Sequence, residues 1–194
     1  MTVPVKARTL AEGLFDPARL EAVFERCFAA QYRTRLCGGA AEPLYQPAAD
    51  EGQLHLLQYR QDYFASALHE TAHWCIAGEK RRREVDFGYW YAPDGRTAEQ
   101  QRAFESAEYK PQALEWFFSQ ACGYRFRLSA DNLGGLAGEL PDDIAFRGRV
   151  LGQARQWQVN GLPTRATRFY QALCSEFNTS RSIADLEFTE DQLL

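Results

Sequence analysis

The stretch from residue 63 to residue 78 reads YFASALHETAHWCIAG, and the rest of the chain is interpreted around it. Its apolar residues recur at helical spacing, which predicts a helix over residues 61–77. Residues four apart on a helix share one face, so His69 and His73 can both reach a single metal ion. Glu70 is one step around the helix, close enough to contact a metal-bound water. The pentad HETAH therefore predicts a metal site, and the alternative is two histidines that only hydrogen-bond on a helix face.

The size and composition of the chain are those of a globular protein. With 194 residues, of which 45% are hydrophobic, we expect a single domain over residues 1–194 with a substantial core. The net charge of −4, from 22 basic and 26 acidic residues, argues against bulk electrostatic binding to nucleic acid. No run reaches the roughly 18 apolar residues that a membrane-spanning helix needs, so we expect no membrane partner.

The cysteines and the N-terminus indicate a cytoplasmic protein. The five cysteines are odd in number and form no CxxC pair, which fits reduced thiols and argues against a zinc site made of thiolates. Residues 1–14 contain two basic residues but no apolar core, so we expect no secretory signal.

The remaining pattern predicts the α+β class, with a small mixed β-sheet packed with helices. Strands are predicted at three short stretches, 53–60, 84–91 and 124–129. Further helices are predicted from capping residues and apolar spacing at 16–28, 97–110, 111–122, 141–160 and 164–177, with a bend at Pro111. Segments expected to be irregular are the loops 37–39 and 42–50 and the loosely ordered ends 1–15 and 178–194.

Two imidazoles alone hold a metal ion poorly, so we expect a third protein ligand. The one other histidine, His55, lies upstream in a predicted strand and is a fallback. A carboxylate is the better expectation, with Glu108 ranked first, followed by Glu105 and Asp86. Two histidines and one carboxylate on one face suit ferrous iron that binds dioxygen, and the same set suits zinc in a hydrolase. The spacing leaves both metals open.

Three longer strings carry a more specific resemblance. They are ASALHETAHWCIAGEKRRREVDFGYWYAPDGR (65–96), FESAEYKPQALEWFFSQACGYRF (104–126) and SADNLGG (129–135). Together they resemble the elongation factor P hydroxylase family, and the similarity covers most of the chain. Unusual strings such as HWCIAG, DFGYWY and KPQA make this resemblance far more specific than the HExxH motif alone.

This resemblance implies an oxidoreductase that hydroxylates the modified lysine of elongation factor P after a β-lysyl group has been attached to it. It implies a non-haem metal with the matching ligands His69, His73 and Glu108. We expect this metal to be Fe(II), with Glu70 of the HExxH motif beside it as a further catalytic residue. The implied fold is similar to a small α+β metallohydrolase of the kind seen in a bacterial rRNA-processing endoribonuclease. That endoribonuclease family uses a third histidine downstream of the helix, and this chain has no histidine after His73.

The implied reaction also predicts what surrounds the metal. Hydroxylation needs dioxygen and a source of electrons, and no nucleotide-binding glycine motif reveals the electron donor. Because the β-lysyl-lysine arm is cationic, acidic side chains are expected to hold its ammonium groups, and Glu70 is one candidate. The other expected substrate-binding residues are Asp86, Tyr89, Trp90, Asp131 and Asn132.

Three alternative functions remain open on the sequence. The first is a zinc-dependent peptidase that uses Glu70 as a general base. The second is a metal-dependent nuclease, suggested by the fold analogy and the basic run 80–83, although the acidic total charge disfavours it. The third is a non-enzymatic binding module with a structural metal site. The basic run itself is interpreted either as a solvated loop after the helix or as a docking patch for an acidic partner.

Overall fold

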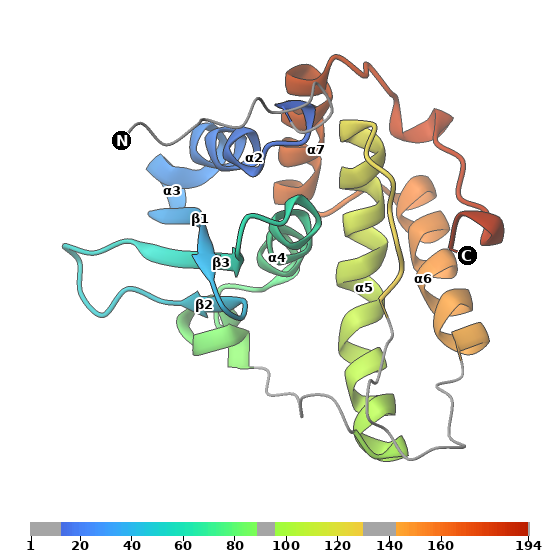
Figure 1. Cartoon of the computed structure of the whole chain (residues 1–194), viewed down its shortest axis with the longest axis horizontal. Helices are drawn as coiled ribbons and strands as arrows, with labels where there is room; N and C mark the ends of the chain where they lie inside the picture. The colour runs from blue at the N-terminus through green and yellow to red at the C-terminus, as the bar shows by residue number, and fades with distance from the viewer. Residues whose placement is uncertain (1–12, 89–95, 130–142, 194) are drawn as a thin grey trace, which may run out of the picture.

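The computed structural model describes residues 13–88, 96–129 and 143–193. Its centre is the helix α4 (Phe64–Ile76), which carries both histidines and lies between a small sheet and the long helix α5 (Ala98–Cys122) (Figure 1). The predicted α+β class is thereby confirmed, and the likeness to a metallohydrolase stays a prediction.

Three further helical regions enclose this centre. The chain enters through α2 (Pro17–Phe24), which continues through the π-turn η1 (Glu25–Ala29) into α3 (Ala30–Tyr32). The helices α6 (Asp143–Asn160) and α7 (Thr164–Phe177) pack against α5. The helices predicted at 16–28, 141–160 and 164–177 are therefore present.

The sheet has three strands in the order β1-β3-β2. β1 (Thr34–Ala40) is parallel to β3 (His55–Arg60), whereas β2 (Leu44–Gln46) is antiparallel to it, so the sheet is mixed as predicted. The strand predicted at 53–60 is β3, and α4 packs on it.

The expectation that 37–39 and 42–50 are loops is wrong where β1 and β2 form. The two glycines that suggested a turn instead accommodate a bulge in β1, where the pairing register with β3 shifts between Cys37 and Ala40. A Cβ atom on Gly38 would lie 2.5 Å from the carbonyl oxygen of Gln61, so only glycine fits this approach. Pairing with β3 therefore overrides the local turn signal.

The strand predicted at 84–91 is also wrong over its described part. Asp86 and Phe87 have φ angles of 48° and 58°, and this left-handed pair turns the chain within the 3₁₀ segment η3 (Val85–Gly88). One distant and one local contact hold the turn: Asp86 Oδ1 accepts the backbone N–H of Tyr45 at 2.7 Å, and Arg81, from the preceding turn, donates to the carbonyl of Phe87 at 2.9 Å. Residues 89–91 of the prediction lie outside the described residues.

The stretch 124–129 belongs to no sheet, so the strand predicted there is wrong as well. The segment runs along α5 (Figure 1), and the side chain of Gln112 pairs with the backbone of Ser129. Gln112 Nε2 donates to the Ser129 carbonyl at 2.6 Å, and its Oε1 accepts the Ser129 N–H at 3.0 Å. A buried side chain thus supplies the pairing that a neighbouring strand supplies in a sheet.

One continuous helix, α5, replaces the two helices and the bend that Pro111 predicted. Its start is as expected, with a capping box between Thr97 and Gln100. Pro111 removes one backbone hydrogen bond. The helix nevertheless continues, because α4, α6 and α7 all pack on it and its residues 116–118 are almost completely buried. Tertiary packing outweighs the local preference here.

The predicted core stripe of α4, formed by Phe64, Leu68, Thr71 and Cys75, is buried. The polar composition of residues 178–194 predicted loose order. In the structure this segment packs on the core, with Leu186, Phe188 and Leu193 buried. Of the predicted loose N-terminal segment, 1–12 lies outside the described residues. Among the described helices, none is long and apolar enough to cross a membrane.

Two arginines bind the C-terminal end of α4. Arg165, at the start of α7, donates to the carbonyls of Trp74 and Cys75 at 3.1 Å and lies over the Trp74 ring. Arg82, from the basic run, donates to the Ala77 carbonyl at 2.6 Å and lies over the Tyr32 ring. These cations satisfy carbonyls that a helix end leaves without intrahelical partners. At least this arginine of the run is therefore engaged within the fold.

We expect Arg165→Met to lower the free energy of unfolding by about 1–3 kcal/mol, because it removes a donor from partly buried carbonyls. The measurement is urea denaturation followed by circular dichroism. Arg168→Met on the same helix is the matched control, since Arg168 is exposed and its hydrogen bond to Gln31 is long, at 3.4 Å. Equal effects of the two substitutions would contradict the role assigned to Arg165.

Candidate metal centre

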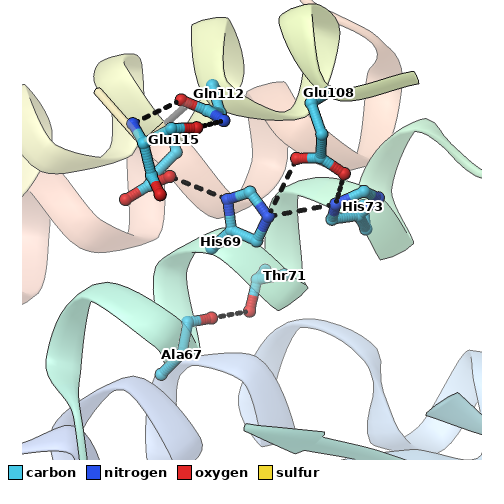
Figure 2. A network of polar contacts seen from close by, with 8 residues as sticks. Ala67, His69, Thr71, His73, Glu108, Gln112 and Glu115 are labelled. Atoms are coloured by element: carbon cyan, nitrogen blue, oxygen red, sulfur yellow. Dashed lines mark hydrogen bonds and ion pairs between the residues drawn. The ribbon is translucent and has the colours of Figure 1, made fainter. Parts of the chain in front are cut away.

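Three predicted ligands meet in the space between α4 and α5. His69 and His73 extend from one face of α4, one turn apart, and Glu108 reaches them from α5 (Figure 2). His69 Nε2 lies 3.1 Å from His73 Nε2 and 3.2 Å from Glu108 Oε2, and His73 Nε2 lies 3.2 Å from Glu108 Oε1. Each residue offers one donor atom, and in the described part of the chain this is the group of three that can hold a metal ion.

The donor separations fit a bound ion. Two ligand atoms about 2.1 Å from one metal are about 3.0 Å apart at a right angle and about 3.4 Å apart at the tetrahedral angle. The observed contacts of 3.1–3.2 Å lie between these two values, so they fit either geometry; the two 3.2 Å contacts use different oxygens of Glu108. Two imidazoles and one carboxylate are also the donor set of non-haem iron and of catalytic zinc.

The charges at this cluster stabilise one another. Burial alone would raise the pKa of Glu108, but the two imidazoles beside it hold that pKa far below its usual range. Burial alone would lower the pKa of His69, but hydrogen bonds and negative charge from Glu108 and Glu115 raise it well above its usual value. The ionised carboxylate of Glu108 therefore lies beside the His69 ring, which binds its proton strongly. A metal ion that binds to His69 has to displace that proton.

The competing third-ligand candidates are engaged elsewhere. The Glu105 carboxylate accepts a hydrogen bond from Gln101 at 3.0 Å. Asp86 binds the Tyr45 backbone, and His55 Nδ1 accepts the N–H of Ala48 at 2.9 Å. Of the candidates that the sequence left open, Glu108 is the one that the structure places at the histidine pair.

Glu115 is at the site and was not predicted. Its Oε2 lies 2.8 Å from Nδ1 of His69, on the side of the ring away from Glu108 (Figure 2). Glu115 follows Glu108 by seven residues, or two helical turns, and so shares its face of α5. The seven-residue spacing could have indicated that the two glutamates share a face. The bend expected at Pro111 instead assigned them to different helices.

A cavity of about 670 Å³ opens beside the three donors. Its polar lining is mostly acidic, with Glu42 and Asp86 from the sheet side and Glu70 from α4, while Phe87 and Phe104 are apolar walls. Burial raises the pKa of Glu70, although the neighbouring imidazoles partly offset this effect. Glu42 was not predicted, because nothing local distinguishes it from other exposed acids.

Of the five expected substrate-binding residues, only Asp86 can be placed, and it lines this cavity. Four of them, Tyr89, Trp90, Asp131 and Asn132, lie outside the described residues. Arg96 and Arg127 add two cations to the lining, so the cavity is not uniformly acidic.

Comparison with known proteins identifies the family. A family model described as "Elongation factor P hydroxylase" matches residues 23–188, a span that includes both histidines, Glu108 and Glu115. The chain belongs to the elongation factor P hydroxylase family. Membership confirms the resemblance found in the sequence, and it makes the chain an enzyme of the hydroxylase class, an oxidoreductase.

A curated relative agrees with this assignment. The "Elongation factor P lysine hydroxylase" of Haemophilus influenzae is 46% identical over 162 residues, which cover 84% of this chain and 89% of the relative. The similarity to this member of the elongation factor P hydroxylase family therefore spans nearly the whole of both proteins.

We expect metal binding at this centre to release one proton and to weaken as the pH falls, because the raised pKa of His69 means that its ring carries a proton in the metal-free protein. Below that pKa, affinity should fall about tenfold per pH unit. Calorimetric titration with Co(II) in buffers of different ionisation enthalpy measures the proton count. His55→Gln is the control and should bind as the unchanged protein does, whereas Glu108→Gln should bind weakly. Binding without proton release would argue against His69 as the ligand.

Proposed function

We propose that this protein uses Fe(II), held by His69, His73 and Glu108, to hydroxylate the β-lysyl-modified lysine of elongation factor P. The observation that carries the proposal is the meeting of His69, His73 and Glu108, whose nitrogens and carboxylate oxygens make contacts of 3.1–3.2 Å at the edge of a cavity with several carboxylates in its lining. Family membership supports the reaction class, and the name of the curated relative supports the protein substrate. Because the proposed substrate is a translation factor, we infer a cytoplasmic location.

The metal supplies the chemistry that side chains lack. Bound iron together with dioxygen provides the oxidising power to insert one oxygen atom into an unactivated C–H bond, and three protein ligands leave positions open for small molecules. The second oxygen atom leaves as water, which requires two electrons and two protons from a donor of a kind that the sequence does not reveal.

The protein groups bind the ion and enclose the reaction. The ionised Glu108 balances part of the charge of a divalent cation, and the imidazoles supply neutral donors once the ring proton has left. Phe87, which is nearly completely buried and lies parallel to the His73 ring, and Phe104 form apolar walls. Such walls exclude water and limit side reactions.

The charge of the cavity suits the proposed substrate. A β-lysyl-lysine arm carries two ammonium groups, and Glu42, Glu70 and Asp86 present carboxylates along the lining. One oxygen of Asp86 already accepts the Tyr45 N–H, so Asp86 is tied to the sheet as it faces the cavity. Glu42 is exposed and stands between β1 and β2. We therefore assign Glu70 and Asp86 to the inner part of the arm and Glu42 to its outer part.

A zinc-dependent peptidase remains the second candidate, because Glu70 of the HExxH motif lines the same cavity. In that reaction Glu70 is the general base that activates a zinc-bound water. The two functions differ in the metal, in the need for dioxygen and in the product.

The deciding measurement is mass spectrometry of β-lysylated elongation factor P after incubation with this protein, Fe(II) and ascorbate under air. We expect a gain of one oxygen atom on the modified lysine. No gain is expected without dioxygen or with His69→Ala. If zinc supports peptide cleavage that is lost in Glu70→Gln, and no oxygen is gained, the peptidase is correct instead.

We expect Glu42→Gln to raise the KM for β-lysylated elongation factor P about two- to fivefold with little change in kcat, because it removes one exposed attraction for an ammonium group. Glu51→Gln is the control, since Glu51 is equally exposed and does not line the cavity. The kinetics are measured by mass spectrometry at several substrate concentrations. An unchanged KM for Glu42→Gln would remove this residue from the substrate path.

A further inference from the structure

The buried carboxylate of Glu115 faces the outer nitrogen of a proposed metal ligand. Glu115 is 7% exposed, and its Oε2 lies 2.8 Å from Nδ1 of His69. Figure 2 shows the His69 ring between two glutamates of α5, with Glu115 on one side and Glu108 on the other. The described residues offer the Glu115 carboxylate this one hydrogen-bond partner.

This contact selects one form of the His69 ring. When Glu115 is ionised, its carboxylate only accepts hydrogen bonds, so the atom that faces it, Nδ1 of His69, carries the hydrogen. In the neutral ring the lone pair is then on Nε2, which is the atom that faces His73 and Glu108. The ring is thus held in the tautomer and the orientation that a metal ion needs.

The second histidine is held differently. Within the described chain, no side chain or carbonyl accepts a hydrogen bond from Nδ1 of His73, and its ring lies parallel to Phe87 with 6.4 Å between the ring centres. His69 is therefore the ring of the pair that a carboxylate orients.

We infer that Glu115 is a positioning residue, which fixes His69 with Nε2 toward the ligand gap and thereby sets the affinity of the centre for its metal. This inference rests on the proposed metal site. In the metal-free protein the same carboxylate pairs with the His69 ring, so the fold and the metal site both favour a carboxylate at this position.

Glu115→Gln tests the inference because it keeps the size of the side chain and an acceptor oxygen but removes the charge. We expect the dissociation constant for Co(II), measured by calorimetry, to rise about 10–100-fold. The melting temperature of the metal-free protein should fall by only a few degrees, because Glu108 still pairs with the His69 ring. Glu105→Gln is a closely matched control, because Glu105 is also on α5 and also 7% exposed but bonds to Gln101. It should leave Co(II) affinity within about twofold.

A spectroscopic readout separates positioning from general weakening of the fold. The chain has three histidines, so ¹⁵N spectra of the zinc-loaded protein with labelled histidine contain three rings. We expect the Nδ1 proton of His69 far downfield, as for a ring bonded to a carboxylate, and shifted upfield in Glu115→Gln.

The outcomes are distinct. Equal Co(II) affinities of the unchanged protein and Glu115→Gln, or an equal loss in Glu105→Gln, would overturn the role of Glu115 and leave the metal site standing. If the unchanged protein itself binds neither Co(II) nor Zn(II), the proposed metal centre fails, and the positioning role fails with it. If Glu115→Gln melts at a much lower temperature than the unchanged metal-free protein, the residue is structural and the inference is wrong.

Discussion

The contact between α4 and α5 is the constraint on which the site depends. The histidine pair comes from a helix whose other face is buried in the core, and Glu108 and Glu115 come from a helix surrounded by three others. Neither helix contains a complete centre. Only their packing places a carboxylate on each side of the His69 ring. A change that disturbs the packing of the two helices therefore also disturbs the geometry of the site.

Part of this arrangement is local and was predictable. The helical period alone places His69 and His73 on one face, and the apolar positions of the same helix identify its buried side. Glu108 was harder, since the chain has many carboxylates and only the family resemblance favoured this one decisively. Glu115 was not predicted, because its role exists only where two helices touch and because Pro111 suggested a break between the two glutamates.

The errors have the same physical origin. Residues 84–88 have the composition of a strand, but Asp86 and Phe87 adopt left-handed backbone conformations that contacts with Tyr45 and Arg81 hold in place. Pro111 has the chemistry of a helix end, but packing from several helices keeps α5 continuous. In each case contacts between segments distant in sequence outweigh a local preference, and such contacts leave no periodic signal.

The placement of Glu108 and Glu115 on one uninterrupted helix has a consequence for how the chain can vary in evolution. Each residue added to a helix turns everything beyond it by about 100°, so one insertion between the two glutamates would carry Glu115 away from the His69 ring. Of the side chains in between, only Lys110 is exposed and free to change, and the length of the segment is fixed. Across related proteins, gaps in the alignment should therefore avoid this seven-residue interval.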